Sequence, residues 1–142
     1  MKHPGSKFLY TEERNKDLIR AYREHAFSCI KINLPILMQR IVDSPSKRFW
    51  VSERRAAIVV SGMIKGIYPK NISKMKLEMY EEIYRRVLAM QKQYPNRSVS
   101  ELTAAVVGQK APKFYLTPGS AHVIIHKILK SCRKKRQEKL QL

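Results

Sequence analysis

Two groups of basic side chains in this sequence stand where they could bind phosphate groups. Arg54 and Arg55 begin a helix that is expected to run to Lys65. Positive charge at a helix N-terminus opposes the helix dipole, and such a mild misfit is compatible with a functional role, such as contact with phosphate or with the edge of a guanine base. The alternative is two solvated arginines. A second cationic run lies near a helix C-terminus, where cations suit the dipole, and it either contacts nucleic acid or is a solvated terminus: Arg133, Lys134, Lys135 and Arg136.

A pair of histidines in the last expected helix has the spacing of metal ligands. His122 and His126 are one helical turn apart and therefore share one face of that helix. Zinc proteases need a glutamate after the first histidine, where this chain has Val123, and no third ligand is evident. We therefore predict no metal site and assign both histidines to a polar surface or to contact with a nucleic-acid backbone.

Catalytic patterns are missing from the sequence. It has no glycine-rich phosphate loop, no paired carboxylates and no Ser/His/Asp arrangement within a supporting motif. Glu78, Glu81 and Glu82 fall on one charged helix and indicate a solvated face. We expect a protein that is not an enzyme, with no catalytic residues and no cofactor.

The overall charge points to an anionic partner. Lysine and arginine total 29 against 11 acidic residues, which gives a formal net charge of +18 and a pI near 10.2. Such an excess repels itself in the folded state, and a polyanion relieves that repulsion. Nucleic acid is the expected partner, with DNA favoured over RNA.

The N-terminal segment, the lack of long apolar stretches and the two cysteines indicate the cellular location of the protein. The first residues lead into a polar helix rather than into the apolar core of a signal peptide, and no stretch approaches the roughly 18 apolar residues of a membrane span. Cys29 and Cys132 are expected to be free thiols in a reducing compartment. These features predict a cytoplasmic, nucleoid-associated protein that contacts no membrane.

Helical patterns cover most of the chain, and 44% of its residues are hydrophobic, which is enough for a core. Hydroxyl and amide residues that can cap helix N-termini precede the apolar stripes, and glycine or proline follows several of them. The last helix should run to about Lys135. The expected helices begin near Thr11, Asn33, Ser52, Ser73, Ser98 and Thr117.

The two halves of the chain share one pattern. Residues 47–52 (KRFWVS) align without gaps on residues 112–117 (PKFYLT), and apolar positions of the following helices coincide as well. We call this alignment, in which Lys47 matches Pro112, the repeat register. A repeat of this size indicates two copies of one small helical unit. We therefore predict an all-α fold of two tandem three-helix units related by an internal repeat. The expected segments are a basic arm (1–10), a first unit (11–66), a connector (67–72), a second unit (73–135) and a basic tail (136–142).

Each unit resembles the tri-helical helix-turn-helix class of DNA-binding proteins. The resemblance lies in a short second helix, 34–42 or 99–107, followed by a capped third helix, 52–65 or 117–130. In that class the third helix enters the major groove, and its early exposed positions meet base edges. The resemblance gives this role to Arg54, Arg55, Ile58 and Ser61 in the first copy, and to Gly119, Ser120, His122 and His126 in the second.

The loops that join the second and third helices depart from that class. They are longer than its usual turn of three or four residues, and each carries an aromatic pair, Phe49 with Trp50 and Phe114 with Tyr115. We expect these four side chains to anchor the loops to a core. Exposure of one of each pair would instead favour stacking on single-stranded bases.

The leading hypothesis is binding of duplex DNA by a regulator or an architectural factor. Basic residues would supply affinity, and the starts of the third helices would supply specificity. The alternatives are an RNA-binding component of a ribonucleoprotein, and a helical structural or interaction protein with an acidic partner. The sequence also allows a homo-dimer, although no heptad seam requires one. The candidate nucleic-acid-binding residues are Lys47, Arg48, Arg54, Arg55, Ser61, Lys65, Lys113, Thr117, Ser120, His122, His126, Lys127, Lys130, Arg133, Lys134, Lys135 and Arg136.

Overall fold

The computed structural model describes residues 6–27 and 33–140, and these residues form α-helices joined by loops. Within them no strand forms, and the β-type contact is an isolated antiparallel bridge between Ser46 and Ala111. The fold is all-α, as the sequence predicts. The helices are α1 (Ser6–Phe27), α2 (Leu34–Val42), α3 (Glu53–Ile64), α4 (Lys74–Gln93), α5 (Val99–Val107) and α6 (Pro118–Leu140).

Side-chain caps fix where four of the helices begin. Each capping hydroxyl accepts a hydrogen bond from an amide of the first helical turn, which would otherwise be unpaired. Asn33 occupies the expected N-cap position of α2, but its side chain makes no cap hydrogen bond. Gly66, with φ of 85°, follows the end of α3 as predicted. The capping hydroxyls are those of Ser52, Ser73, Ser98 and Thr117, at 3.1 to 3.3 Å.

The first helix starts earlier than predicted. Thr11 lies inside α1, so the predicted N-cap at Thr11 is wrong, and residues 6–10 of the expected arm are helical. No proline or glycine interrupts residues 6–11, and the partly buried Tyr10 packs against a core cluster, which favours continuation of the helix. Residues 1–5 of the expected arm and the predicted free thiol of Cys29 lie outside the described residues.

The last helix is longer than predicted. It continues to Leu140 instead of ending near Lys135, so residues 136–140 of the expected tail are helical. Gly66 stops α3, whereas the position that matches it in the repeat register is Ser131, which imposes no stop. The residues that follow are mainly lysine, arginine, glutamine and glutamate, which favour helix.

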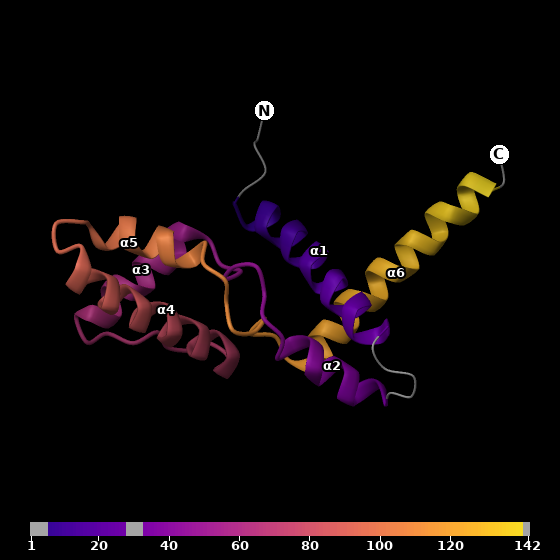
Figure 1. The fold of residues 1–142 in the computed structure, drawn as a ribbon, viewed down its shortest axis with the longest axis horizontal. Coiled ribbons are helices and arrows are strands. Elements are labelled where there is room, and N and C mark those ends of the chain that lie inside the picture. The colour runs from indigo at the N-terminus through magenta and orange to yellow at the C-terminus, as the bar shows by residue number, and fades with distance from the viewer. Residues whose placement is uncertain (1–5, 28–32, 141–142) are drawn as a thin grey trace.

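The helices pack into two lobes (Figure 1). One lobe contains α3, α4 and α5, on the left of the figure, and the other contains α1, α2 and α6, on the right. Among the described residues, α2 does not contact α3 and α5 does not contact α6, although these helices are neighbours in sequence. Each lobe therefore takes one helix from the other half of the chain.

This exchange differs from the expected contiguous units. The sequence pattern predicts the units 11–66 and 73–135. In the structure, α6 packs on α1 and α2, and α3 packs on α4 and α5. The physical cause lies in the two long loops. Instead of turning back, they run past each other, joined by the bridge between Ser46 and Ala111, and carry each third helix into the opposite lobe.

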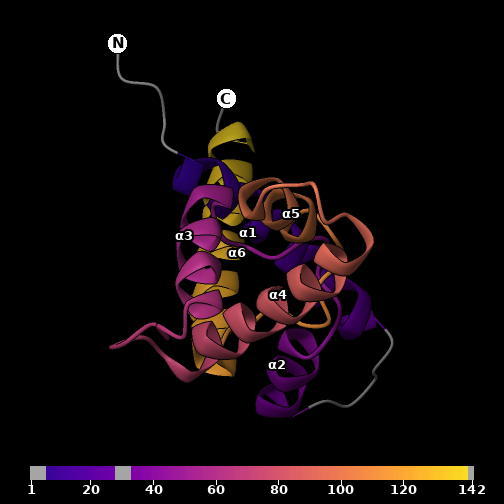
Figure 2. The same cartoon turned by 90° about the vertical axis from the view of Figure 1, so that its left-hand side faces the viewer.

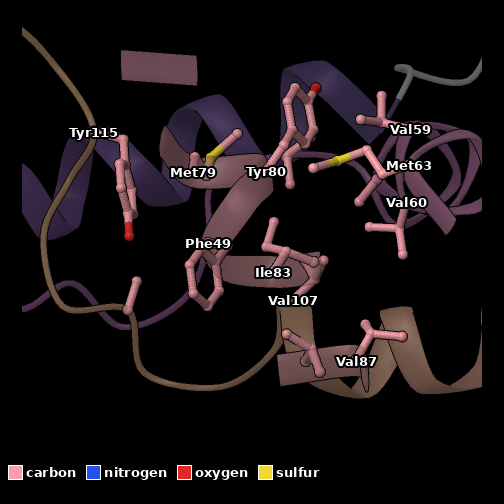
Figure 3. Packing of buried hydrophobic residues seen from close by; sticks show 14 of the residues in the cluster. Phe49, Val59, Val60, Met63, Met79, Tyr80, Ile83, Val87, Val107 and Tyr115 are labelled. Atoms are coloured by element: carbon pink, nitrogen blue, oxygen red, sulfur yellow. The ribbon is translucent and has the colours of Figure 1, made fainter. Parts of the chain in front are cut away.

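The aromatic residues of the crossing loops are divided between two cores. Phe49 and Tyr115 enter the core of α3, α4 and α5, where their ring centroids lie 6.0 Å apart (Figure 3). Trp50 and Phe114 enter the core of α1, α2 and α6. None of the four is more than 9% exposed, so the prediction that they anchor the loops is confirmed and they are not placed to stack on bases. Each loop is thereby held in both lobes.

Contacts in the two lobes match in the repeat register. The amide of Phe49 donates to the carbonyl of Val107 at 3.0 Å, and the amide of Phe114 donates to the carbonyl of Val42 at 3.0 Å. The register pairs Phe49 with Phe114 and Val42 with Val107, so the two hydrogen bonds are equivalent. It also pairs the two residues of the antiparallel bridge, at positions 46 and 111, with each other. These matched contacts support an internal repeat, which stays a prediction from pattern and packing.

Candidate nucleic-acid interface

The outer face of α3 carries a row of polar and cationic side chains. Arg54, Ser61 and Lys65 recur at helical spacing and so line one side of the helix, with Arg55 next to the row at its start. The arginines and Lys65 are exposed, and Ser61 is half-buried. Together with Glu53, Ile67 and residues of α5, this face forms a shallow groove of about 670 Å³.

The exposed surface of α6 is longer and more basic. His122 and His126 are exposed, with ring centroids 6.3 Å apart, and Lys127 and Lys130 are exposed on the same helix. Every residue from 131 to 140 is exposed as well. That last stretch carries the basic side chains Arg133, Lys134, Lys135, Arg136 and Lys139.

At the start of α6, two hydroxyls are already engaged with each other. Thr117 accepts a hydrogen bond from the backbone amide of Ser120 at 3.1 Å, and its own hydroxyl donates to that of Ser120 at 2.9 Å. Both residues remain exposed. Pro118 has no amide hydrogen, and the amides of Ser120 and Ala121 donate to Thr117, so a phosphate oxygen at this helix N-terminus would have to compete with Thr117 for them.

The positive charge is unevenly distributed among the helices. α6 carries seven lysine and arginine residues against one glutamate. The two other long helices are close to balanced, with five basic and four acidic residues in α1 and five basic and three acidic residues in α4. A polyanion is therefore attracted to α6 more strongly than to either of them.

The two exchanged helices lie along the same side of the molecule, one in each lobe (Figure 2). The buried face of α3 packs on α4 and α5, and that of α6 packs on α1 and α2. No other described helix packs on α3 or on α6. The candidates on α3, such as Arg54 and Lys65, and those on α6, such as Lys130, therefore belong to helices of different lobes that run along one side of the fold.

Arg48, another candidate, is engaged at the crossing of the loops. Its guanidinium donates to the carbonyls of Phe49 at 3.1 Å and Val51 at 2.9 Å, and it lies 5.5 Å from the centroid of the Trp50 ring. These contacts fix the loop. A phosphate group would have to compete with them for the same donors.

Lys113, the counterpart of Arg48 in the second loop, is also engaged. Its ammonium group donates to the carboxylate of Glu78 at 2.8 Å and lies 5.3 Å from the centroid of the Tyr115 ring. The hydrogen bond from Lys113 lowers the pKa of the Glu78 carboxyl. Neither Arg48 nor Lys113 lies on the outer faces of α3 and α6.

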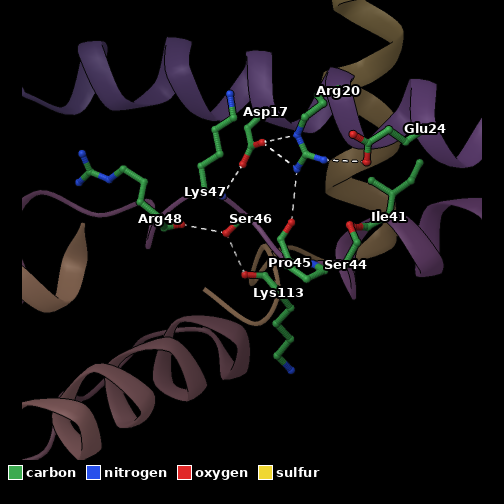
Figure 4. Close-up of polar contacts among 10 residues, drawn as sticks. All are labelled: Asp17, Arg20, Glu24, Ile41, Ser44, Pro45, Ser46, Lys47, Arg48 and Lys113. Carbon is green, nitrogen blue, oxygen red and sulfur yellow. Dashed lines mark hydrogen bonds and ion pairs between the residues drawn. The ribbon is translucent and has the colours of Figure 1, made fainter. Parts of the chain in front are cut away.

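A buried carboxylate joins the first crossing loop to α1 (Figure 4). Asp17, which is 1% exposed, accepts a hydrogen bond from the amide of Lys47 at 2.8 Å and pairs with Arg20 at 2.8 Å. Arg20 also pairs with Glu24 at 2.8 Å and donates to the carbonyl of Pro45 at 3.4 Å. Lys47 contributes its backbone to this network, and the residue remains exposed.

The second loop is joined to α4 in a different way. Glu82 matches Asp17 in the repeat register, but Pro112 stands where the first loop has its donating amide, and proline has no amide hydrogen. Glu82 pairs instead with Arg86 at 3.0 Å, and Arg86 donates to the carbonyl of Lys110 at 3.0 Å. In the first loop the carboxylate of Asp17 thus accepts directly from a loop amide, whereas in the second loop Arg86 bridges the carboxylate of Glu82 and a loop carbonyl.

A larger groove, of about 970 Å³, lies beside α1, α2 and the crossing loops. Its walls include Lys47 and Lys110, but also the carboxylates of Glu24 and Asp43. Arg20 and Glu24, which also line this groove, pair with each other, so part of its positive charge is already neutralised. We therefore place the candidate interface on α3 and α6.

The described residues form neither a metal-binding cluster nor a membrane-spanning helix. No group of three or more histidine, cysteine, aspartate or glutamate side chains among them could hold a metal ion. None of the helices given above is both long enough and apolar enough to cross a membrane. The thiol of Cys132 is free and exposed, as expected.

Two side chains on the outer faces are absent from the candidate set. Ile58 on α3 is 56% exposed and Val123 on α6 is 53% exposed. The resemblance includes Ile58 but not Val123, although the repeat register pairs them. Both positions fall on the side of the helix opposite the buried apolar stripe, and this pattern in the sequence could have identified both residues as exposed.

Comparison of the chain with known protein families, with curated proteins and with solved structures finds no match.

Proposed function

We propose that this protein is a non-enzymatic nucleic-acid-binding protein whose main target is duplex DNA. In this proposal α3 and α6 are the two contact helices, and the protein acts as a regulator or architectural factor at the nucleoid in the cytoplasm. The basic residues of α6 supply most of the affinity. The start of α3, with Arg54 and Arg55, supplies preference among sequences.

The observation that carries this proposal is the accumulation of charge on one exposed helix. Five of the seven basic residues of α6 lie within residues 131–140, and every residue of that stretch is exposed. Like charges one turn apart repel each other, so this stretch is held in an unfavourable arrangement while no anion is bound. A phosphate backbone removes the repulsion and releases counterions.

The exchange of helices supports duplex DNA over a smaller anion. Two helices with exposed polar faces lie on one side of the molecule, in different lobes. Proteins that recognise duplex DNA commonly present two helices to successive segments of the major groove. The faces of α3 and α6 differ in sequence, with Arg54 matched by Gly119 and Ser61 matched by His126, so the two halves of a preferred site would differ as well.

The first test is binding of a fluorescent random duplex, measured by anisotropy from about 50 to 200 mM salt. The test variant replaces Arg133, Lys134, Lys135 and Arg136 by alanine. A matched control removes the same charge from exposed positions elsewhere, by alanine at Lys70, Lys74, Lys76 and Lys92.

We expect tight binding with a steep salt dependence for the unaltered protein. The slope of log affinity against log salt falls by about 0.9 for each phosphate contact that is lost. The α6 variant should therefore lose up to about 3.6 from this slope, if all four residues contact phosphates, and the control should lose much less. Equal losses in both variants would mean that net charge alone, rather than the face of α6, attracts the duplex.

A second test concerns sequence preference. Replacement of Arg54 and Arg55 by alanine should weaken binding to the best selected duplex more than binding to random duplex. Loss of a good arginine contact to a guanine costs about 1–3 kcal/mol of discrimination. Equal losses on both duplexes would contradict base recognition by α3.

The same measurements separate the remaining functions. Preference for structured RNA over duplex DNA at equal salt would assign the protein to a ribonucleoprotein. Binding to neither nucleic acid, together with a stoichiometric acidic protein in a gently purified sample, would assign it to a protein assembly.

A further inference from the structure

Two exposed aliphatic side chains occupy matching positions on the contact helices. Ile58 and Val123 are 56% and 53% exposed, and the repeat register pairs them. Both are β-branched, and each lies near the middle of the outer face, one turn after Arg54 or Gly119. The repeat register also pairs buried positions of the two helices, such as Val60 and Ile125. The correspondence between α3 and α6 therefore includes both their buried and their exposed sides.

The surroundings of these two side chains are mainly polar, with more cations than acids. On α3, Ile58 lines a groove with Arg54, Ser61 and Lys65, and the same groove also includes Glu53 and the exposed Ile67. On α6, the neighbours of Val123 include His126 and Lys127. Each aliphatic group therefore lies within a face that carries a positive net charge and attracts anions.

The edges of the bases in the major groove offer one apolar group that suits such a point. Thymine presents its 5-methyl group there, beside the hydrogen-bonding edges of the other bases and between two rows of phosphates. A helix with an exposed aliphatic residue and cations along the same face, such as Arg54 and Lys65 on α3 or Lys127 and Lys130 on α6, matches this arrangement in charge.

We propose that Ile58 and Val123 contact thymine 5-methyl groups, one in each half of the preferred duplex site. This inference rests on the proposed function and adds a specific base to it. The cations beside each aliphatic residue bind phosphates, and the aliphatic residue excludes water from the methyl group. Because α3 has Arg54 one turn before its aliphatic residue and α6 has Gly119, a guanine contact is expected beside the thymine in one half only.

The test uses the full chain and a duplex selected from a randomised pool. Thymines of the selected site are replaced one at a time by deoxyuridine, which lacks only the 5-methyl group. Binding is measured for the unaltered protein, for Ile58→Ala and for Val123→Ala. The control variant is Ile64→Ala, which removes an exposed aliphatic side chain from a different face of α3.

We expect a loss of about fourfold in affinity at one thymine in each half, the equivalent of one buried methyl group. Ile58→Ala should remove the sensitivity at one of these thymines, and Val123→Ala should remove it at the other, because a double-mutant cycle isolates the pair in contact. Ile64→Ala should leave both sensitivities in place. The replaced residues are exposed, so circular dichroism and thermal unfolding should show an unchanged fold.

Other outcomes overturn the inference. Full affinity for the deoxyuridine duplexes would show that no methyl group is contacted, and so would a loss that persists unchanged in both alanine variants. Salt-dependent binding with no selected sequence would overturn it while leaving the proposed function in place. Absence of binding to any duplex would remove the proposed function as well, and capture of one protein that depends on Ile58 would reassign this face to that protein.

Discussion

Ser46 and Ala111 are hydrogen-bonded to each other in both directions, with N–O distances of 3.1 Å and 3.0 Å. The two residues are buried, and they belong to the loops that carry α3 and α6 into opposite lobes. The Ser46 hydroxyl lies 2.8 Å from the carbonyl of Arg48 and 3.3 Å from that of Lys113, so it also contacts both loops. This pair is the point at which the two halves of the chain cross.

Replacement of Ser46 by alanine tests the importance of the crossing. The change removes a buried hydroxyl that donates to loop carbonyls, and we expect the free energy of unfolding to fall by about 1–2 kcal/mol. Urea unfolding followed by circular dichroism measures it. Ser100→Ala, at an exposed helical position, is the control and should change stability by less than about 0.5 kcal/mol. Equal effects would mean that the hydroxyl contributes nothing specific to the crossing.

Asp17 should contribute more to stability than its neighbour Glu24, although both pair with Arg20. Asp17→Ala leaves the amide of Lys47 without its acceptor and removes a charged hydrogen bond, at a cost of about 2–3 kcal/mol. Glu24→Ala removes an exposed ion pair worth at most about 1 kcal/mol. Thermal unfolding of the two variants compares them, and a larger loss for Glu24→Ala would contradict this role of Asp17.

Trp50 is the single tryptophan of the chain, and its indole nitrogen is buried without a hydrogen-bond partner among the described residues. Trp50→Phe removes that unpaired donor, which offsets the loss of ring contacts, so we expect a stability change within about 1 kcal/mol. Trp50→Ala leaves a cavity and should cost about 3–5 kcal/mol. Denaturant curves followed by circular dichroism measure both changes. A loss for Trp50→Phe as large as that for alanine would show that the indole nitrogen is satisfied in solution.

Tyr115 predicts a dependence of stability on alkaline pH. Burial, with a smaller effect of Glu82, raises the pKa of the Tyr115 phenol to about 12. The tyrosine pKa in the unfolded state is about 10, so the folded state holds this proton more tightly. The resulting contribution of Tyr115 to the free energy of unfolding is therefore complete below pH 10 and is lost as the pH rises towards 12. Absorbance of tyrosinate at increasing pH should show one late titration that Tyr115→Phe lacks. A titration that is identical in both proteins would contradict the shift.

Removal of residues 131–142 separates folding from binding. Residues 131–140 are all exposed, so we expect the thermal stability of the shortened chain to stay close to that of the full chain. Its affinity for random duplex at about 50 mM salt should fall by more than about tenfold, since five basic residues are lost. Unchanged affinity would show that the duplex binds a different surface of the protein.

Local patterns in the sequence determined where most helices begin and end. Ser52, Ser73, Ser98 and Thr117 cap helices because a hydroxyl next to an apolar stripe satisfies amides of its own first turn. Gly66 ends α3 for an equally local reason. The errors at Thr11 and Lys135 concern helix ends that lack such a stop, where neighbouring residues continue the helix.

The sequence by itself also determined that Phe49, Trp50, Phe114 and Tyr115 are buried, because large aromatic side chains gain most from leaving water. Only the tertiary structure decided which core each of them enters, and that choice places α3 against α4 and α5, and α6 against α1 and α2. The reason is that both lobes have apolar faces of the same period, so burial is satisfied by either partner. The extended loops around Ser46 and Ala111, through contacts between residues far apart in the chain, select the exchanged pairing.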